Sequence, residues 1–333
     1  MRLDDPRATP DARDGDPLTA AELPSYLRQR RVSPAEAKIT VSALGGGISN
    51  TVLLAEWEGG AVVVKQPLAQ LRVDDEWTFD RARVFVERDC MATLAGRLPG
   101  SAPEVVFSDD ARYVLGMTLA PCGGVVWRDE HDAGRADPAR TQQAARLLGR
   151  LHASTAGSAE LAQRFADQMP LIEGRIDPYH RTAAARHPDL APAIGAEIER
   201  LLATRLCLVH GDYSPKNLIA YPDRMLMIDF EVAHYGDPAF DVAFLLALVL
   251  LDGMRHDDPT FAVEARRFWN VYREAAGGAV AHAPNVVAEL ACILLARIDG
   301  KSRLPLPVDV QRRGREHARR LLAGVPLEDA LAL

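Results

Sequence analysis

Three oxygen-bearing side chains near the middle of the chain have the types and spacing that phosphoryl transfer requires. Residues 209–217 read Val-His-Gly-Asp-Tyr-Ser-Pro-Lys-Asn, and residues 227–231 read Met-Ile-Asp-Phe-Glu. Phosphoryl transfer needs a carboxylate that aligns the attacking hydroxyl and oxygen ligands for the metal that bridges the nucleotide phosphates. Asp212 suits the first task, while Asn217 and Asp229 supply the hard oxygen atoms that Mg²⁺ prefers. We therefore predict Asp212 as the catalytic residue and Asn217 and Asp229 as metal ligands.

At these residues the chain resembles a known superfamily. His-x-Asp with Asn five positions after the Asp is the catalytic-loop pattern of protein kinases. Its His-Gly-Asp form at 210–212 resembles the aminoglycoside phosphotransferase and choline kinase superfamily of small-molecule kinases. Protein kinases carry Asp-Phe-Gly in their second motif, whereas residues 229–231 read Asp-Phe-Glu. Residues 228–236 are similar instead to the Asp-x-Glu segment of methylthioribose kinases, which implies that Glu231 is a further metal ligand.

A glycine-rich turn in the amino-terminal half is a candidate phosphate-binding element. Residues 39–41 and 51–56 are predicted strands, and they flank residues 44–50, Leu-Gly-Gly-Gly-Ile-Ser-Asn. Glycines let a backbone approach an anion closely. Alone the turn is weak evidence, because a glycine triplet before a strand is most often only a turn. The predicted nucleotide-binding residues of the turn are Gly45, Gly46, Gly47, Ser49 and Asn50.

A lysine at the end of a β-branched run is the next candidate. Residues 61–66 read Ala-Val-Val-Val-Lys-Gln, which resembles the kinase strand whose lysine pairs with the α- and β-phosphates. Residues 81–95 are a predicted helix, in which Glu87 is the predicted ion-pair partner of Lys65. A lysine in this place can also simply reach solvent. Lys65, Glu87 and Trp77 again resemble methylthioribose kinases, and the motifs follow one another in the order of a kinase-like fold.

The predicted fold is α+β and two-lobed, like that of protein kinases. At 333 residues the chain exceeds the roughly 250 to 300 residues of a usual single core. We expect residues 1–17 to form a disordered tail, because they are rich in Asp, Arg and Pro. Residues 18–119 are predicted to form an N-lobe with a small antiparallel sheet, the glycine turn and the nucleotide lysine. Residues 120–333 are predicted to form a mainly helical C-lobe with the catalytic loop and the acceptor site.

The predicted hinge between the lobes starts at residues 113–119, which read as a core strand, and continues into the Pro- and Gly-containing segment 120–124. The resemblance implies that backbone groups of such a hinge meet the adenine edge, which places Met117 and Leu119 beside the nucleotide. The alternative is a strand that simply enters a loop.

Helices are expected beyond the hinge. Asp137 followed by Pro138 predicts a helix start, with a capping side chain and a proline in the first turn. His152, at the end of that helix, is predicted to be a hydrogen-bonded core residue. The resemblance implies that His210 orients the catalytic loop and that Asp241 is a buried acid that accepts hydrogen bonds from the loop backbone.

The sequence leaves the acceptor open. Residues 297–303, Arg-Ile-Asp-Gly-Lys-Ser-Arg, either bind the acceptor, as carboxyl-terminal helices do in this superfamily, or form only a charged helix end. The roles of Asp299, Lys301 and Arg303 stay open, and Lys216 either touches the γ-phosphate or is a solvated loop charge. Methylthioribose kinases of the usual type lack the Tyr-Ser-Pro-Lys-Asn ending of the catalytic loop. Methylthioribose, another sugar, an aminoglycoside, a choline-like amine and an amino-acid or acyl hydroxyl are all compatible, because fold does not fix substrate.

Charge and composition argue against nucleic-acid and membrane partners. A formal net charge of −7 argues against a nucleic-acid binder, which would normally carry a basic face. The amino terminus lacks an apolar core, so neither a signal peptide nor an anchor is predicted. The longest apolar run, residues 242–251, is far short of the roughly 20 residues that cross a bilayer, so we expect no membrane partner. Four separated cysteines without zinc spacing predict buried thiols and a cytoplasmic protein; the oligomeric state stays unknown.

Together these observations predict an enzyme that uses ATP and Mg²⁺ to phosphorylate a hydroxyl of a small molecule such as a sugar, an aminoglycoside or an amino alcohol. The alternative from another class is a catalytically silent nucleotide-binding regulatory protein, but a degenerate site would be expected to have lost one of its polar residues. A protein kinase is less favoured, because no activation segment ending in Ala-Pro-Glu is evident. Nothing in the sequence separates a metabolic role from antibiotic resistance.

Overall fold

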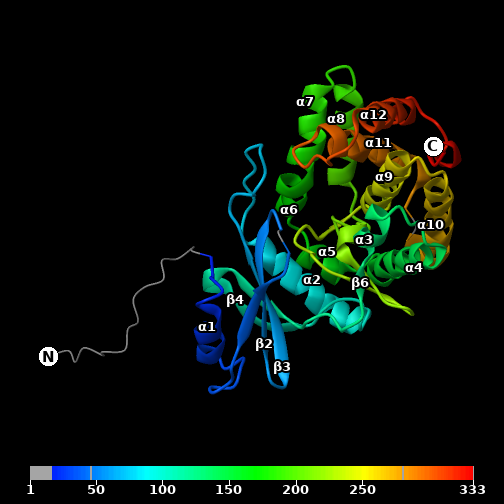
Figure 1. Cartoon of the computed structure of the whole chain (residues 1–333). Helices are drawn as coiled ribbons and strands as arrows, with labels where there is room; N and C mark the ends of the chain where they lie inside the picture. Colours follow the sequence, from blue (N-terminus) through cyan, green and yellow to red (C-terminus); the bar gives the residue numbers. More distant parts are fainter. Residues whose placement is uncertain (1–16, 46, 280, 333) are drawn as a thin grey trace.

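A computed structural model describes residues 17–45, 47–279 and 281–332. A five-stranded antiparallel sheet dominates the first third of the chain, and helices dominate the rest (Figure 1). This is the predicted α+β arrangement of a small antiparallel sheet followed by a mainly helical part. The predicted tail, residues 1–17, lies almost wholly outside the described residues, as does Gly46. The division into lobes at residue 119 stays a prediction.

The large sheet has the strand order β1-β2-β3-β5-β4. Its strands are β1 (Thr40–Ala43), β2 (Asn50–Trp57), β3 (Gly60–Pro67), β5 (Val114–Met117) and β4 (Val105–Asp109). Side chains alternate between the two faces of a strand. Val62 and Val64 of β3 therefore pack with Leu23 and Leu27 of α1 (Leu23–Gln29). Lys65 points to the opposite face, on the side of α2 (Arg83–Arg97).

Predicted and observed boundaries differ by one or two residues in this region. The strands expected at 39–41 and 51–56 are β1 and β2, and the helix expected at 81–95 is α2. The β2–β3 hairpin closes through Gly59, whose φ of +84° is a left-handed conformation that glycine adopts without strain. The short 3₁₀ segment η1 (Asp110–Arg112) joins β4 to β5.

Two smaller sheets hold the predicted catalytic segments. In one, β7 (Cys207–Val209) pairs with β10 (His234–Gly236), and in the other, β8 (Leu218–Ala220) lies between β6 (Val125–Val126) and β9 (Met225–Met227). The chain leaves β7 directly into His210, and it leaves β9 two residues before Asp229. The 3₁₀ segment η3 (Pro215–Asn217) lies between β7 and β8. The loop carrying Asp212 and the segment carrying Asp229 thus both emerge from strand ends.

The helical part is built around α9 (Ala239–His256), whose residues 239–254 are all buried. This helix contains the apolar run 242–251 and packs against α11 (Ala283–Asp299). Alongside it α4 (Pro138–Thr155) packs against α10 (Thr260–Ala276). The predicted start of α4 is confirmed, because the Asp137 carboxylate accepts a hydrogen bond from the Ala139 N–H at 2.8 Å.

The remaining elements surround this core. They are α3 (Trp127–Asp132), α5 (Ala159–Arg164), α6 (Met169–Leu171), the π-helical segment η2 (Ile172–Arg181), α7 (Thr182–Arg186), α8 (Ala191–Ala203), η4 (Gly277–Ala279), α12 (Val308–Leu322) and α13 (Leu327–Ala330). Among the described residues, no helix combines the length and apolar character that spanning a bilayer demands.

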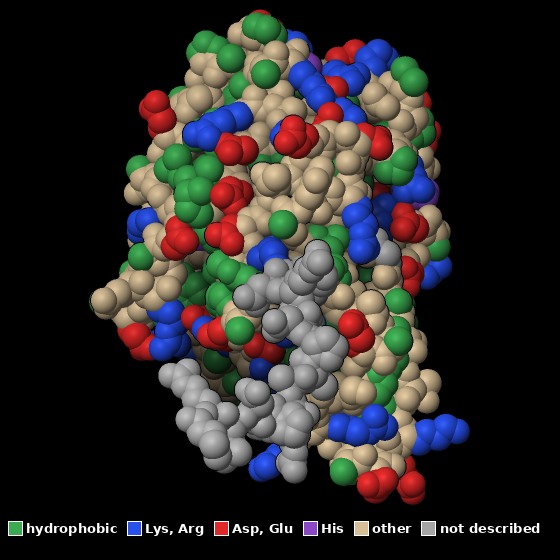
Figure 2. Space-filling view, turned by 90° about the vertical axis from the view of Figure 1, so that its left-hand side faces the viewer, with side chains coloured by type: hydrophobic (Ala, Val, Ile, Leu, Met, Phe, Trp, Pro, Cys, Tyr) green, Lys and Arg blue, Asp and Glu red, His purple; other side chains and the backbone are tan. Residues whose placement is uncertain are grey.

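The surface carries mixed charge. Figure 2 shows basic and acidic side chains interspersed over the described part of the face that it presents. The expectation of buried thiols holds for Cys90, Cys207 and Cys292 and is wrong for Cys122, which is exposed. Cys122 lies in the Pro-Cys-Gly-Gly connection between the large sheet and β6, and residues 121–124 of this connection are all exposed.

Candidate active site

The Asp241 carboxylate holds the predicted catalytic loop through hydrogen bonds from the loop backbone. This carboxylate is fully buried and accepts hydrogen bonds from the backbone N–H groups of His210 at 2.7 Å and Gly211 at 2.8 Å. Nε2 of His152 lies 3.2 Å from the same carboxylate, and its Nδ1 lies 3.0 Å from the Tyr272 hydroxyl. Burial raises the pKa of Asp241, but these donors outweigh it and hold the pKa below its usual range. The contacts agree with the predicted structural roles of Asp241 and His152.

The ring of His210 joins two segments of the site. Its Nε2 lies 3.1 Å from the Ile228 carbonyl oxygen, and its Nδ1 lies 3.2 Å from the backbone N–H of Asp212. Burial lowers the pKa of His210 and so favours the neutral ring. A neutral ring can donate from Nε2 and accept at Nδ1, as these two bonds require. This geometry agrees with the interpretation of His210 as a residue that orients the loop.

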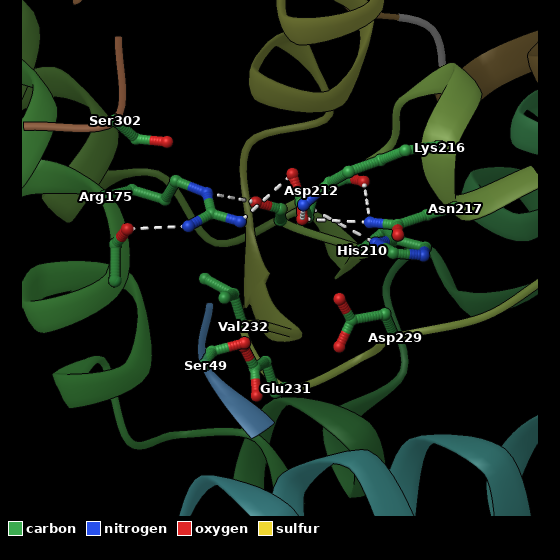
Figure 3. Close-up of polar contacts among 12 residues, drawn as sticks. Ser49, Arg175, His210, Asp212, Lys216, Asn217, Asp229, Glu231, Val232 and Ser302 are labelled. Carbon is green, nitrogen blue, oxygen red and sulfur yellow. Dashed lines mark hydrogen bonds and ion pairs between the residues drawn. The ribbon is translucent and has the colours of Figure 1, made fainter. Parts of the chain in front are cut away.

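Asp212 is a buried carboxylate held by three side chains (Figure 3). Arg175 Nη2 lies 3.1 Å from Oδ1, while Asn217 Nδ2 and Lys216 Nζ each lie 2.9 Å from Oδ2. Burial raises the pKa of Asp212, but the charges of Lys216 and Arg175 outweigh that effect and lower it. The carboxylate is therefore ionised at neutral pH. Lys216 is exposed, as in the alternative of a solvated loop charge, and its ammonium group also pairs with Asp212. Contact with a γ-phosphate stays a prediction.

Arg175 was not singled out from the sequence. It lies in η2, and besides Asp212 it donates from Nε to the Gly211 carbonyl at 2.8 Å and from Nη1 to the Gly174 carbonyl at 2.6 Å. Arg175 is thus hydrogen-bonded to the backbone of the loop whose Asp212 carboxylate it pairs with. No motif marks this arginine, and a π-helical segment containing Pro178 gives no regular periodicity from which its direction could be inferred.

Lys65 of β3 links α2 to the segment that carries Asp229. Its Nζ lies 2.6 Å from Glu87 Oε2 and 2.5 Å from Asp229 Oδ1, so the predicted Lys65–Glu87 ion pair is present. Burial lowers the pKa of Lys65, but attraction by Asp229 and Glu87 outweighs it and raises the pKa. Burial also raises the pKa of Glu87 to about 7 against the pull of Lys65. Asp229 has a φ of +70°, a left-handed backbone that is uncommon outside glycine.

Glu231 connects the glycine turn to the second motif. Its Oε2 accepts hydrogen bonds from Asn50 Nδ2 at 2.9 Å and from Arg83 Nε at 3.1 Å. Arg83 is buried and also donates to the carbonyls of Ser49 at 2.7 Å and Leu68 at 2.9 Å. These bonds make Glu231 an anchor of the turn. Its role as a metal ligand stays a prediction, and sequence analysis missed Arg83 altogether.

The other predicted nucleotide-binding residues lie in the turn between β1 and β2 and at the end of β5. Gly45, with a φ of +73°, and Gly47 are exposed in the turn between β1 and β2. Met117 ends β5 and is buried, and Leu119 follows it half-buried in the connecting segment. Their contacts with a nucleotide stay predictions.

A cavity of about 420 Å³ opens beside Asp212. Lys65 is not among its lining residues, and the predicted segment 297–303 contributes Arg297 and Ser302 to it. Its lining consists of Arg128, Asp132, Tyr179, Asp212, Ser214, Pro215, Lys216, Phe244, Leu248, Asp252, Arg255, Arg297, Ser302, Leu304, Pro305 and Leu306.

The rest of segment 297–303 makes contacts elsewhere. Asp299 accepts hydrogen bonds from Arg315. Lys301 Nζ donates to the Glu76 carbonyl at 2.5 Å, and Arg303 pairs with Asp75 at 3.4 Å. These last contacts tie the loop after β3 to the carboxyl-terminal part of the chain.

Fold and site together have the arrangement of the protein-kinase-like class: the Lys65–Glu87 pair contacts Asp229 of the Asp-x-Glu segment, and Asp212 lies in the predicted catalytic loop. The chain matches the model of the APH phosphotransferase enzyme family over residues 40–278 and belongs to that family. The predicted membership of the small-molecule kinase superfamily is thereby confirmed.

Curated relatives include methylthioribose kinases. Methylthioribose kinase 1 of Oryza sativa subsp. japonica is 26% identical over 268 residues, which are 70% of this chain and 62% of the relative. The methylthioribose kinase of Pectobacterium atrosepticum is 27% identical over 270 residues, 71% of this chain and 66% of the relative. The chain therefore matches somewhat less than two thirds of the length of these proteins.

Solved structures confirm the predicted fold. A choline kinase from Cryptosporidium parvum Iowa II has a TM-score of 0.59 at 11% identity, covering 94% of this chain and 99% of that one. The GDP complex of aminoglycoside 2'-phosphotransferase-IIIa has a TM-score of 0.57 at 15% identity, covering 92% of this chain and 99% of that one. At such identities the likeness shows the fold alone.

Proposed function

We propose that the chain is an ATP- and Mg²⁺-dependent phosphotransferase that phosphorylates a hydroxyl of a small molecule. One observation carries the proposal: the ionised carboxylate of Asp212 lines a cavity of small-molecule size and also accepts a hydrogen bond from the Asn217 amide. Membership of the phosphotransferase family and the likeness to methylthioribose kinases support the same activity. They do not fix the acceptor.

The donor set fits a magnesium ion. Asn217 turns its amide nitrogen to Asp212, which leaves the amide oxygen for another partner. Asp229 uses Oδ1 for Lys65 and keeps a second oxygen. These are hard oxygen ligands of the kind that Mg²⁺ selects. When bound by Asn217 and Asp229, the metal would neutralise charge on the nucleotide phosphates.

The chain's own residues then have distinct tasks. Lys65, steadied by Glu87, would bind the α- and β-phosphates, and Asn50 and its turn would cover them. Asp212 would accept a hydrogen bond from the acceptor hydroxyl and align its oxygen with the γ-phosphorus. Because its pKa is lowered, Asp212 is a weak base that takes the proton only as the new O–P bond forms. Arg175 would hold the Asp212 carboxylate in place throughout.

The test uses labelled ATP with the purified chain, a metabolite panel and a generic protein substrate. We expect label on a small molecule, and in Asp212→Asn a loss of about 10²- to 10⁴-fold in turnover with nucleotide affinity nearly unchanged. Asp229→Asn, the matched carboxylate-to-amide change, should instead weaken Mg²⁺-dependent nucleotide binding. Label on protein alone would identify a protein kinase, and no label anywhere would identify a silent nucleotide-binding protein.

A further inference from the structure

We infer that the acceptor carries an anionic group in addition to its reacting hydroxyl, and that Arg297 binds this group. The inference rests on the proposed function and concerns the cavity beside Asp212. It specifies a hydroxy acid or a phosphorylated alcohol, in which a carboxylate or phosphate presents the same oxyanion chemistry. It also excludes cationic amines as preferred acceptors.

The acidic side chains of the cavity are already paired with cations. Asp252 pairs with Arg128 at 3.0 Å and also contacts the His131 ring at 2.9 Å. Asp132 pairs with Arg128 at 2.5 Å and with Arg255 at 2.9 Å. Asp212, the remaining acid of the lining, pairs with Lys216 and Arg175. An ammonium group entering the cavity would meet no free carboxylate in this lining.

The aromatic side chains of the cavity are also engaged. A quaternary or protonated amine can bind over an aromatic ring within about 6 Å of its centroid. The guanidinium carbon of Arg175 already lies 5.3 Å from the ring centroid of Tyr179 and 5.5 Å from that of Phe244. A second cation at either ring would be repelled by Arg175. Both usual ways of binding an amine are therefore blocked.

Arg297 differs from the other cations of the lining. Within the described part of the chain no carboxylate lies within 4.0 Å of it. Its Nη1 donates to the Tyr179 hydroxyl at 3.0 Å and to Ser302 Oγ at 2.8 Å, so the side chain is held by neutral oxygens. Its Nε is buried without a hydrogen-bond partner in that same part of the structure. The pKa of Tyr179 is lowered although burial raises it, because Arg297 and Arg175 make the surroundings positive.

A basic groove adjoins the cavity next to Arg297. It has a volume of about 680 Å³ and shares Ser302, Leu304, Pro305 and Leu306 with the cavity. Five basic side chains line it against two acidic ones, Asp74 and Asp299. The basic ones are Arg72, Arg186, Lys301, Arg303 and Arg315. Arg186 and Arg303 pair with Asp75, and Arg315 pairs with Asp299, whereas among the described residues Arg72 and Lys301 donate only to backbone carbonyl oxygens. The groove therefore keeps an excess of positive charge, which attracts an anion toward Arg297 and repels a polycation.

The experiment compares acceptors that share a skeleton and differ in charge. One series is glycerol, glycerate, glycerol 3-phosphate and 3-aminopropane-1,2-diol, and the other is glucose, glucuronate, glucose 6-phosphate and glucosamine. Binding to the full chain is measured by calorimetry, and phosphorylation by label from ATP. The variants are Arg297→Gln, Arg297→Lys and, as a control, Arg312→Gln on the exposed side of α12. Circular dichroism tests whether each variant is folded. If Arg297→Gln does not fold, Arg297→Lys replaces it in the comparison.

We expect an anionic member of at least one series to bind about 10- to 100-fold more tightly than the aminated member, the range given by one charge-assisted hydrogen bond. Arg297→Gln should raise KM for the anionic acceptor by that factor and leave kcat nearly unchanged, Arg297→Lys should retain part of the affinity, and Arg312→Gln should match the unaltered chain. Carboxylate and phosphate members tell the two kinds of anion apart.

Three results overturn the inference. The first is that the aminated members bind as tightly as the anionic ones or more tightly, and the second is that no anionic member binds. The third is that Arg297→Gln lowers kcat equally for neutral and anionic acceptors, because this would place the arginine at the γ-phosphate. Binding without label transfer would refute the proposed function alone. Label transfer to an aminated acceptor alone would refute only the inference.

Discussion

The change of Glu231 to glutamine separates two roles that this residue could have. As a metal ligand it would be needed for Mg²⁺ binding, and as an anchor it would hold Arg83 and Asn50 through Oε2. The substitution keeps the shape of the side chain and one oxygen acceptor but removes the charge. The anchor role therefore predicts a loss of stability, whereas the metal-ligand role predicts a higher Mg²⁺ requirement.

The expected cost follows from the burial of the pair. Arg83 is 2% exposed and Glu231 is 7% exposed, so glutamine leaves a buried guanidinium without a counter-charge. Removing one partner of a buried ion pair costs about 3 to 5 kcal/mol. The retained oxygen still accepts one hydrogen bond, and the loss of a negative charge relieves repulsion with Glu87. We therefore expect the free energy of unfolding to fall by about 2 to 3 kcal/mol, because one charge-assisted bond is lost.

Urea unfolding measures the stability, and initial rates over titrations of ATP and Mg²⁺ measure the site. An anchor predicts a higher KM for ATP, because the turn at Asn50 is no longer tied down, with an unchanged Mg²⁺ requirement. Asp229→Asn is the matched control and should raise the Mg²⁺ requirement. The reasoning is wrong if Glu231→Gln leaves stability within about 0.5 kcal/mol, as surface changes do, and raises the Mg²⁺ requirement instead.

Two further predictions concern the support of the catalytic loop. Gly211 has a φ of +77°, and a Cβ added to it would lie 2.5 Å from the Val232 carbonyl oxygen. Gly211→Ala should therefore lower kcat and also lower stability by at least the roughly 1 to 2 kcal/mol that a left-handed alanine costs. The control Gly195→Ala in α8 has open space and should be neutral or stabilising in the same urea assay. Asp241→Asn should cost about 2 to 4 kcal/mol near neutral pH, because two buried N–H groups lose a charged acceptor. Since the folded-state pKa of Asp241 is lowered, its contribution is complete above the ordinary carboxyl pKa of about 4 and declines below it; a gap between the two proteins that widens on acidification would contradict this.

The sequence predicted the parts of the site that are short-range. Asp212 and Asn217 lie in one loop, and a carboxylate five residues before an amide is a pattern that spacing alone reveals. The start of α4 at Asp137 is equally local, because a cap involves only the next two residues. Lys65 and Glu87 were recoverable because a β-branched run and a helix each have a recognisable composition.

Long-range contacts of single arginines were not predictable in this way. Arg83 meets Glu231 across 148 positions, and Arg175 meets Gly211 across 36. Nothing in the local pattern of α2 or η2 distinguishes these arginines from solvated ones. Only the packing of the two parts of the chain determines that both are buried and aimed at the site.

The ties between the loop after β3 and the carboxyl-terminal part of the chain have a consequence for the basic groove. Asp75 pairs with Arg186 at 3.7 Å and with Arg303 at 3.4 Å, and all three side chains are roughly a third exposed or more. Exposed ion pairs contribute only about 0 to 1 kcal/mol each and are screened by salt. Arg186 and Arg303, which line the basic groove, are thus held by weak ion pairs, and dissolved salt weakens this hold further.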